Sequence, residues 1–223
     1  MKKKNINPIC YLCGLPIADT ISDDHIPPSQ FFPSYLRKIL SPNLITLPTH
    51  TQCNKSYQKD EDYFLASFYP ATEKSIIHPY ITDDIQRKLN RKESKLFLNL
   101  ILSEFEERPS GLYLPHNLVR KEIDTKRAIR VAWKITRGLH FYHFKEYLEE
   151  NIEKRIGFYQ TANELPSPAY NFLINSDLFG EYQDVFYYRL SCGCFINPRV
   201  CFHIYLLVLW KSILILTIIK RPC

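Results

Sequence analysis

The chain has 223 residues, enough for one or two domains with a core that needs no disulfides. Its composition, 45% hydrophobic and 23% charged, excludes wholesale disorder, and its 6 glycines exclude a collagen-like chain. Lys and Arg number 29 against 23 Asp and Glu, so the formal net charge of +6 permits a polyanionic partner without requiring one.

The cysteines and the N-terminal segment bear on the cellular compartment. The first eight residues contain no apolar run, so we expect no secretory signal peptide and a cytoplasmic protein. In a reducing compartment, closely spaced cysteines bind metal more often than they form disulfides. The cysteines number seven, which also excludes a disulfide framework that pairs them all. The sequence therefore predicts a cytoplasmic, metal-binding protein.

The first 70 residues form a compositional unit for which we expect the order strand, loop, strand, helix. A strand over 20–24 ends at His25, where the two following prolines interrupt it. A short helix over 34–40 is followed by a second strand over 43–47, which Pro48 is expected to end. From 53 to 69 there is no proline or glycine, and aromatic residues recur at helical spacing, which predicts a helix.

The rest of the chain is expected to begin with helices and to end with strands. Periodicity favours helices over 85–102, 120–137 and 144–156. Prolines and asparagines in 158–178 favour irregular structure, whereas β-branched and aromatic residues in 184–190 favour a strand. The predicted fold class is therefore α+β. Residues 1–70 form one unit, and residues 71–223 form a mostly helical, substrate-contacting region with C-terminal strands.

The apolar segment 200–219 leaves three interpretations open. Thirteen of its 20 residues are Val, Leu, Ile or Phe. Together they favour membrane insertion by roughly 6 kcal/mol, which Lys211 and the polar neighbours largely offset. Two buried strands over 202–210 and 212–219 are the favoured interpretation, and a membrane tail anchor and a degenerate end are the alternatives.

Two pairs of candidate metal ligands share one spacing. Cys10 and Cys13 form a C-x2-C pair, and His50 and Cys53 form an H-x2-C pair. A Cys3His set holds structural Zn²⁺ in tetrahedral sites and leaves no coordination position open for chemistry. The alternative is a pair of buried cysteines unrelated to a surface histidine. Bound zinc would fasten the chain before the first strand to the start of the predicted helix.

Three short motifs lie around these pairs and resemble a known family. They are D-H-I-x-P beginning at Asp24, an asparagine (Asn43) before an apolar strand, and C-N-K beginning at Cys53. With the C-x2-C pair, this order and spacing resembles the HNH endonucleases, whose zinc-bearing members carry such knuckles. The resemblance covers about residues 8–65. It implies that residues 1–70 form a zinc-stapled ββα-metal finger.

The resemblance also implies a function, the metal-dependent hydrolysis of DNA phosphodiester bonds, with His25 as the general base. Asp24 and Asn54 correspond to the ligands of a catalytic Mg²⁺ or Mn²⁺ ion. Asn43 corresponds to the residue that orients the base, and Lys55 is expected to contact the scissile phosphate. The products would carry 5′-phosphate and 3′-hydroxyl ends. No small-molecule cofactor is implied, and the family suggests a role in host defence or a mobile element.

Some residues depart from the family pattern or allow another interpretation. His50 replaces a cysteine of the usual second pair, and Asn54 stands where many members have histidine. His25 alone would fit a histidine that caps a turn. The acidic residues 60–62 fit either a second metal ligand or, more simply, a solvated helix face. The alternatives to a nuclease are a non-catalytic, zinc-stabilised module that binds nucleic acid and a tail-anchored membrane protein.

A basic stripe is predicted on the helix over 120–137. Its members recur at spacings of three and four residues and share one helix face: Arg127, Arg130, Lys134 and Arg137. Such a stripe would neutralise the phosphates of double-stranded DNA, and a solvated helix face is the alternative. The aromatic and histidine-rich segment 139–144 is expected to pack in the core rather than to stack on bases.

Overall fold

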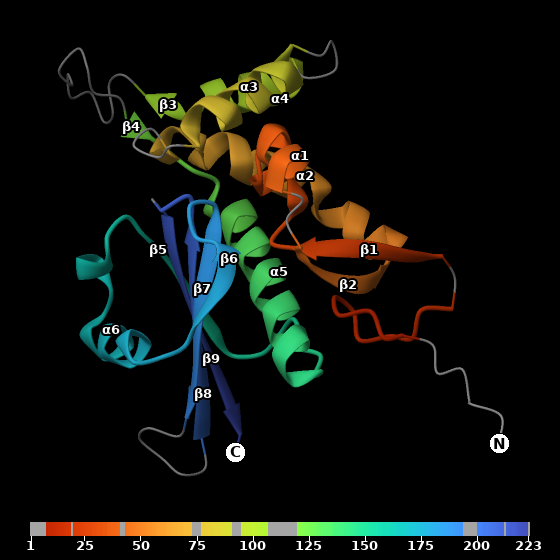
Figure 1. The fold of residues 1–223 in the computed structure, drawn as a ribbon, viewed down its shortest axis with the longest axis vertical. Coiled ribbons are helices and arrows are strands. Elements are labelled where there is room, and N and C mark those ends of the chain that lie inside the picture. Colours follow the sequence, from red (N-terminus) through yellow and green to blue (C-terminus); the bar gives the residue numbers. More distant parts are fainter. Residues whose placement is uncertain are drawn as a thin grey trace.

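Figure 1 shows the computed structural model, in which helices and strands are combined as the α+β prediction required. The structure describes residues 8–18, 20–40, 43–72, 77–90, 95–106, 120–193, 200–211 and 213–222. Its described strands form a two-stranded sheet, a second, very short two-stranded sheet, and a five-stranded sheet.

The N-terminal part follows the predicted order. β1 (Ile21–Ile26) pairs antiparallel with β2 (Ile45–His50), and α2 (Thr51–Phe68) begins directly after β2. A short helix, α1 (Ser34–Leu40), lies between the strands as expected. Pro48 does not end β2 but lies within it, opposite Asp23. A sheet of only two strands leaves one edge of each strand unpaired, and an unpaired edge tolerates a residue without an N–H group.

The helices that follow differ in extent from their predictions. The single helix expected over 85–102 is divided into α3 (His78–Leu89) and α4 (Lys95–Leu102). The short strands β3 (Phe105–Glu106) and β4 (Arg120–Lys121) then pair with each other. α5 (Thr125–Phe144) is capped by Asp124, whose side chain accepts hydrogen bonds from the Lys126 and Arg127 N–H groups.

α5 lies between the β1–β2 pair and the five-stranded sheet (Figure 1). Its apolar residues Val131 and Ile135 are fully buried in a core cluster that extends from Cys10 to Ile219. Gly138 permits the closest approach to β1, because a Cβ atom there would lie 2.5 Å from the Ile26 side chain. The ranges 1–70 and 71–223 thus share one core, and a boundary at residue 70 stays a prediction.

Beyond residue 144 the chain forms mainly sheet, as expected for the C-terminal strands but not for residues 144–156. The helix expected over 144–156 is absent: Lys145 takes a left-handed conformation (φ 56°) that ends α5, and β5 follows. The segment 158–178 is also more regular than expected, since it includes α6 (Ser167–Ile174). The five antiparallel strands lie in the order β5-β9-β8-β7-β6. Their bounds are β5 (Lys154–Tyr159), β6 (Leu178–Tyr182), β7 (Phe186–Gly193), β8 (Val200–Leu209) and β9 (Ile213–Pro222).

The strand interpretation of 200–219 is confirmed. Alternate residues of β8 enter different clusters: Tyr205 and Leu207 face the main core and α5, whereas Leu206 and Val208 pack with Ala169 of α6. Burial on both faces explains the continuous apolar run. Among the described residues, no helix combines the length and hydrophobicity needed to cross a bilayer.

The segment 139–144 packs largely in the core, as predicted, although Tyr142 within it is exposed. His140 is fully buried, with Nδ1 2.7 Å from the Tyr205 hydroxyl and Nε2 3.2 Å from the Arg221 guanidinium. Burial, with the nearby His203 and Arg221, lowers the pKa of His140 to about 3, although Glu146 opposes the shift.

This buried histidine makes stability depend on pH. Below its ordinary pKa of about 6.5, His140 takes up a proton in the unfolded chain but not in the folded chain. Stability should therefore fall as the pH drops through this range, by about 2 kcal/mol at about pH 5. Urea unfolding of wild type and His140→Gln at about pH 7.5 and 5 tests this. Between these two pH values, we expect the unfolding free energy of wild type to fall by about 2 kcal/mol more than that of the variant. Equal decreases would show that His140 does not cause the pH dependence.

Candidate functional site

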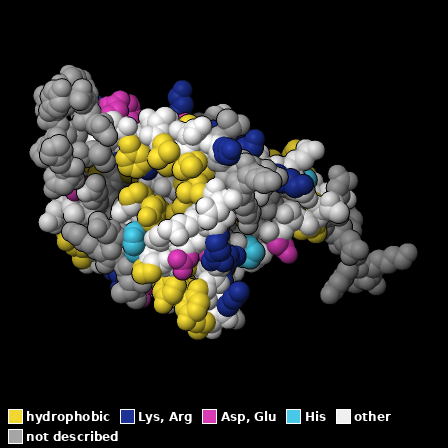
Figure 2. All heavy atoms as spheres, turned by 90° about the horizontal axis from the view of Figure 1, so that it is seen from above, with side chains coloured by type: hydrophobic (Ala, Val, Ile, Leu, Met, Phe, Trp, Pro, Cys, Tyr) yellow, Lys and Arg dark blue, Asp and Glu magenta, His cyan; other side chains and the backbone are white. Residues whose placement is uncertain are grey.

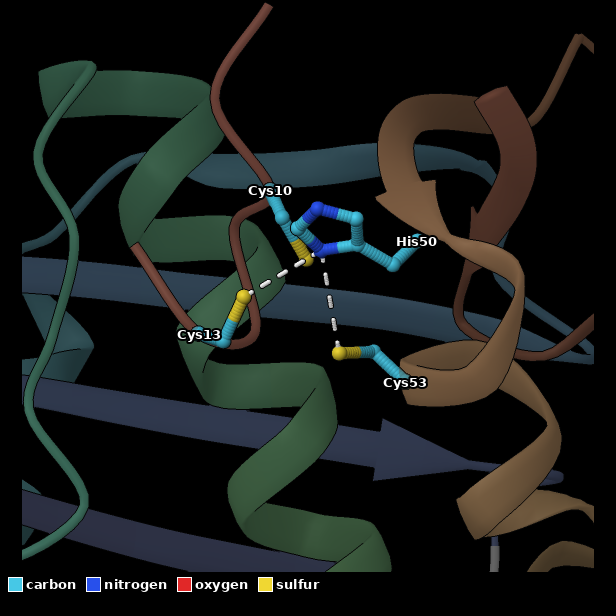
Figure 3. Close-up of side chains that lie close together, drawn as sticks. All are labelled: Cys10, Cys13, His50 and Cys53. Carbon is cyan, nitrogen blue, oxygen red and sulfur yellow. Dashed lines mark hydrogen bonds between the residues drawn. The ribbon is translucent and has the colours of Figure 1, made fainter. Parts of the chain in front are cut away.

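The four predicted zinc ligands come together in space (Figure 3). The donor atoms of Cys10, Cys13, His50 and Cys53 all lie within 4.8 Å of one another. His50 Nδ1 is 3.3 Å from the Cys13 sulfur and 3.9 Å from the Cys53 sulfur. Tetrahedral zinc with its usual bond lengths separates such ligand atoms by about 3.3 to 3.8 Å. The cluster therefore has the composition and the size to hold a metal ion such as zinc.

Local backbone structure brings the two pairs together. The Gly14 N–H donates to the Cys10 carbonyl (2.8 Å), and the Cys10 N–H donates to the Leu15 carbonyl (3.0 Å), which folds the C-x2-C pair into a tight knuckle. Gly14 has φ +74°, a conformation that favours glycine, and the Tyr147 ring packs against it. The other pair is placed by the junction of β2 with α2, since His50 ends the strand and Cys53 lies in the first helical turn.

The surroundings of the cluster suit a cation. His50 Nε2 lies 3.3 Å from the Pro16 carbonyl oxygen, so an Nε2–H donor leaves Nδ1 deprotonated toward the sulfurs. Burial and the neighbouring sulfurs of Cys10 and Cys13 raise the pKa of Cys53 to about 12. A bound divalent cation would offset this repulsion and favour the thiolate.

Two cysteines outside the cluster differ in state. Cys192 is a free thiol, whereas Cys201 is disulfide-bonded. The disulfide differs from the sequence prediction, which placed the cysteines in a reducing compartment.

A second feature is a pocket of about 420 Å³ between β1 and α2. Three of the residues predicted for catalysis line it, Asp24, His25 and Asn54. Lys55, which was predicted to contact the scissile phosphate, lines it as well. The remaining lining residues come from the same two elements and the loop after β1: Ser22, Asp23, Pro28, Ser29, Gln30, Thr51, Gln58 and Glu61. The β1–β2–α2 arrangement thus gathers lining residues that are separated by up to 39 positions in the chain, from Ser22 to Glu61.

His25 is positioned by the alternation of β1. Asp24 and Ile26 are buried on one side, whereas Asp23 is exposed and His25 is half-buried on the other. Within the described ranges the His25 ring makes no hydrogen bond, so the turn-capping alternative finds no partner here. The imidazole is therefore accessible from the pocket and available to bind water.

The two asparagines are placed differently. Asn54 lies in the first turn of α2 and donates from Nδ2 to the Ser22 hydroxyl (3.1 Å), which directs its amide along the pocket wall. Its Oδ1 oxygen is the atom that suits a hard cation. Asn43 is exposed and lines a separate pocket of about 520 Å³, together with Ile26 and Tyr142. The structure therefore does not bring Asn43 to the His25 pocket.

Asp24, predicted as a ligand of the catalytic ion, already has hydrogen-bond and ion-pair partners within the protein. Its carboxylate accepts a hydrogen bond from the Tyr11 hydroxyl (2.6 Å) and one from the Lys134 ammonium (2.9 Å). Lys134 also forms an ion pair with Glu61. Burial raises the pKa of the Glu61 carboxyl, and the Lys134 charge opposes that shift. The spacing of Asn54, Gln58 and Glu61 on one face of α2 was the available signal for including Glu61 in the pocket.

The basic stripe on α5 is not the open surface that was predicted. Lys134 is 0% exposed and Arg137 is 2% exposed, so neither side chain can reach a nucleic acid in this structure. Arg137 pairs with Glu150 (2.8 Å), and both Arg127 and Arg130 pair with Asp60. The stripe faces α2 and the knuckle, and carboxylates of β1, of α2 and of the segment after α5 neutralise it. Helical spacing places four side chains on one face but does not say whether solvent or protein covers that face.

On the face of the molecule that Figure 2 shows, basic side chains are dispersed. Figure 2 shows Lys and Arg scattered singly over one face, with hydrophobic side chains gathered near its centre. Among the residues predicted to contact DNA, Lys55 is exposed, and the Arg127 and Arg130 side chains are 35% and 44% exposed. Of these residues, Arg127 and Arg130 are already engaged in ion pairs with Asp60.

Comparisons of the chain with protein-family models, with curated proteins and with solved structures gave no match. The functional interpretation therefore depends on the motifs and on the pocket itself.

Proposed function

We propose that the chain is an HNH-type endonuclease that hydrolyses DNA phosphodiester bonds with a divalent ion. The observation that carries this proposal is the shared pocket, which gathers Asp24, His25 and Asn54 within two strands and the following helix. The Cys3His cluster lies beside it, because Cys53 and Asn54 are neighbours in the first turn of α2. In this proposal β1, β2 and α2 are the ββα-metal finger, and zinc is its structural ion.

His25 acts as the general base. Its imidazole is half-buried and lines the pocket, and imidazole is the side chain most often used for proton transfer near neutral pH. It removes a proton from the attacking water, and a general base positioned in this way contributes about 100- to 10,000-fold to the rate.

Asp24 and Asn54 hold the catalytic ion through hard oxygen ligands, which suit Mg²⁺ or Mn²⁺. When bound, the ion supplies a charge that stabilises the leaving 3′ oxygen. Lys55, exposed at the same pocket, neutralises a backbone phosphate of the DNA.

Replacing Asn54 tests the ion site directly. We expect Asn54→Ala to need about 10-fold or more Mn²⁺ for half-maximal nicking of supercoiled plasmid, because it removes one oxygen ligand. Gln58→Ala is the control, since Gln58 lines the same pocket one helical turn later. It should keep the wild-type Mn²⁺ dependence. Equal dependence for Asn54→Ala and wild type, with equal zinc content, would show that Asn54 is not a ligand.

A further inference from the structure

A buried lysine lies at the back of the proposed ion site. The Lys134 ammonium, on α5, contacts both oxygens of the Asp24 carboxylate at 2.8 and 2.9 Å and also pairs with Glu61. Lys134 is fully buried, and Asp24 and Glu61 are only 5% and 8% exposed. Both carboxylates nevertheless line the pocket.

The charges in this group do not balance. One ammonium faces two carboxylates, and within the described part of the chain the other hydrogen bonds to them come from neutral donors, the Tyr11 hydroxyl to Asp24 (2.6 Å) and the Gln30 amide to Glu61 (3.3 Å). Buried carboxylates without a compensating cation are costly, because the interior solvates them poorly. A divalent ion at Asp24 would more than neutralise the excess negative charge, but it would also meet the ammonium that already contacts both Asp24 oxygens.

We propose that Lys134 is a positioning residue that stands in for the catalytic cation: its ammonium holds Asp24 and Glu61 in the ion-free protein and competes with the divalent ion for Asp24. This inference rests on the proposed function. When the ion binds, the Lys134 ammonium gives up its contact with Asp24 and keeps its ion pair with Glu61. Lys134 thus keeps Asp24 oriented toward the pocket and sets the ion concentration at which the site fills.

Removing the ammonium therefore has two opposite effects. Lys134→Met keeps a long, unbranched side chain but leaves two buried carboxylates unpaired, so the ion-free protein loses stability. The same change removes the competitor, so the divalent ion binds more tightly, and its binding restores stability by linkage. Arg137→Met is the control, because Arg137 is equally buried one turn later on α5 but pairs with Glu150 away from the pocket.

The experiment measures Mn²⁺ binding by electron paramagnetic resonance and the thermal midpoint during a Mn²⁺ titration, using zinc-loaded full chain in metal-depleted buffer. We expect the Mn²⁺ dissociation constant of Lys134→Met to fall by about 10-fold or more relative to wild type. Its midpoint without Mn²⁺ should be lower than that of wild type and should rise more steeply with added Mn²⁺. Arg137→Met should lose stability without any change in Mn²⁺ affinity.

A second variant covers the case in which Lys134→Met does not fold. Glu61→Gln leaves the ammonium to Asp24 alone, so Mn²⁺ should bind about 3-fold or more weakly than in wild type. An unchanged dissociation constant in folded Lys134→Met, or in Glu61→Gln if the former does not fold, overturns the role of Lys134. If wild type and Asn54→Ala bind Mn²⁺ equally or not at all, the proposed ion site fails, and this inference fails with it.

Discussion

His25→Ala should nick supercoiled plasmid at least about 100-fold more slowly than wild type while it retains zinc and fold. The side chain lines the pocket half-buried and makes no hydrogen bond within the described ranges, so its removal takes away chemistry and little structure. The change in unfolding free energy should therefore stay within about 1 kcal/mol. Initial rates at saturating Mn²⁺ and urea unfolding of both proteins give the two quantities.

The control for this prediction is Asp23→Ala. Asp23 precedes the motif on the same face of β1, lines the same pocket and is exposed. It should retain nicking within about 3-fold of wild type, because it is assigned no role in proton transfer. Added imidazole should also restore part of the rate of His25→Ala. A folded, zinc-loaded His25→Ala that cleaves at the wild-type rate would refute the assignment of the base.

Loss of the metal cluster should have the largest effect on stability. Cys53→Ser is expected to lose bound zinc and cooperative unfolding, because the Cys3His set joins the knuckle to the start of α2. Structural zinc contributes an apparent binding free energy of about 10–16 kcal/mol, comparable with the whole stability of a domain. Elemental analysis should find about one zinc per wild-type chain, and thermal unfolding should show the loss in the variant.

Cys192→Ser is the control, because it removes a thiol that does not belong to the metal cluster. Cys192 is free, exposed and lies on β7, outside the cluster. Its replacement should leave zinc content and the thermal midpoint unchanged. A wild-type chain without zinc, or Cys53→Ser with a wild-type midpoint, would show that the cluster is not a structural metal site.

Local signals predicted the parts of the fold and site that depend on neighbours in the chain. The spacing of Cys10 with Cys13 and of His50 with Cys53 identified the cluster, because ligands with two residues between them can hold one ion in a knuckle or a helical turn. The strands β1 and β2 and the helix α2 were also predicted close to their observed positions. Each is marked by prolines or by periodicity within its own few residues.

The features that were missed depend on contacts between distant segments. β5 is a strand because it pairs with β9, from Lys154 opposite Ile219 to Tyr159 opposite Leu214, and no local pattern encodes a partner so far along the chain. Lys134 was predicted to face DNA and instead meets Asp24, which lies 110 positions earlier. Charge periodicity gives the face of a helix but not the element that covers it. Asp24 was accordingly predicted as an open ligand, whereas it is buried and already paired.

The central claim is that the zinc-loaded chain hydrolyses DNA only with a second divalent ion, and cleavage of supercoiled plasmid tests it most directly. The purified full chain, with its zinc content and fold verified, is incubated with plasmid in metal-depleted buffer, with and without Mg²⁺ or Mn²⁺. The account predicts open-circular and then linear DNA only when the ion is present, with 5′-phosphate and 3′-hydroxyl ends. If folded, zinc-loaded protein leaves the plasmid intact with either ion, the pocket is not a nuclease site. The chain would then be better described as a non-catalytic zinc module that binds nucleic acid.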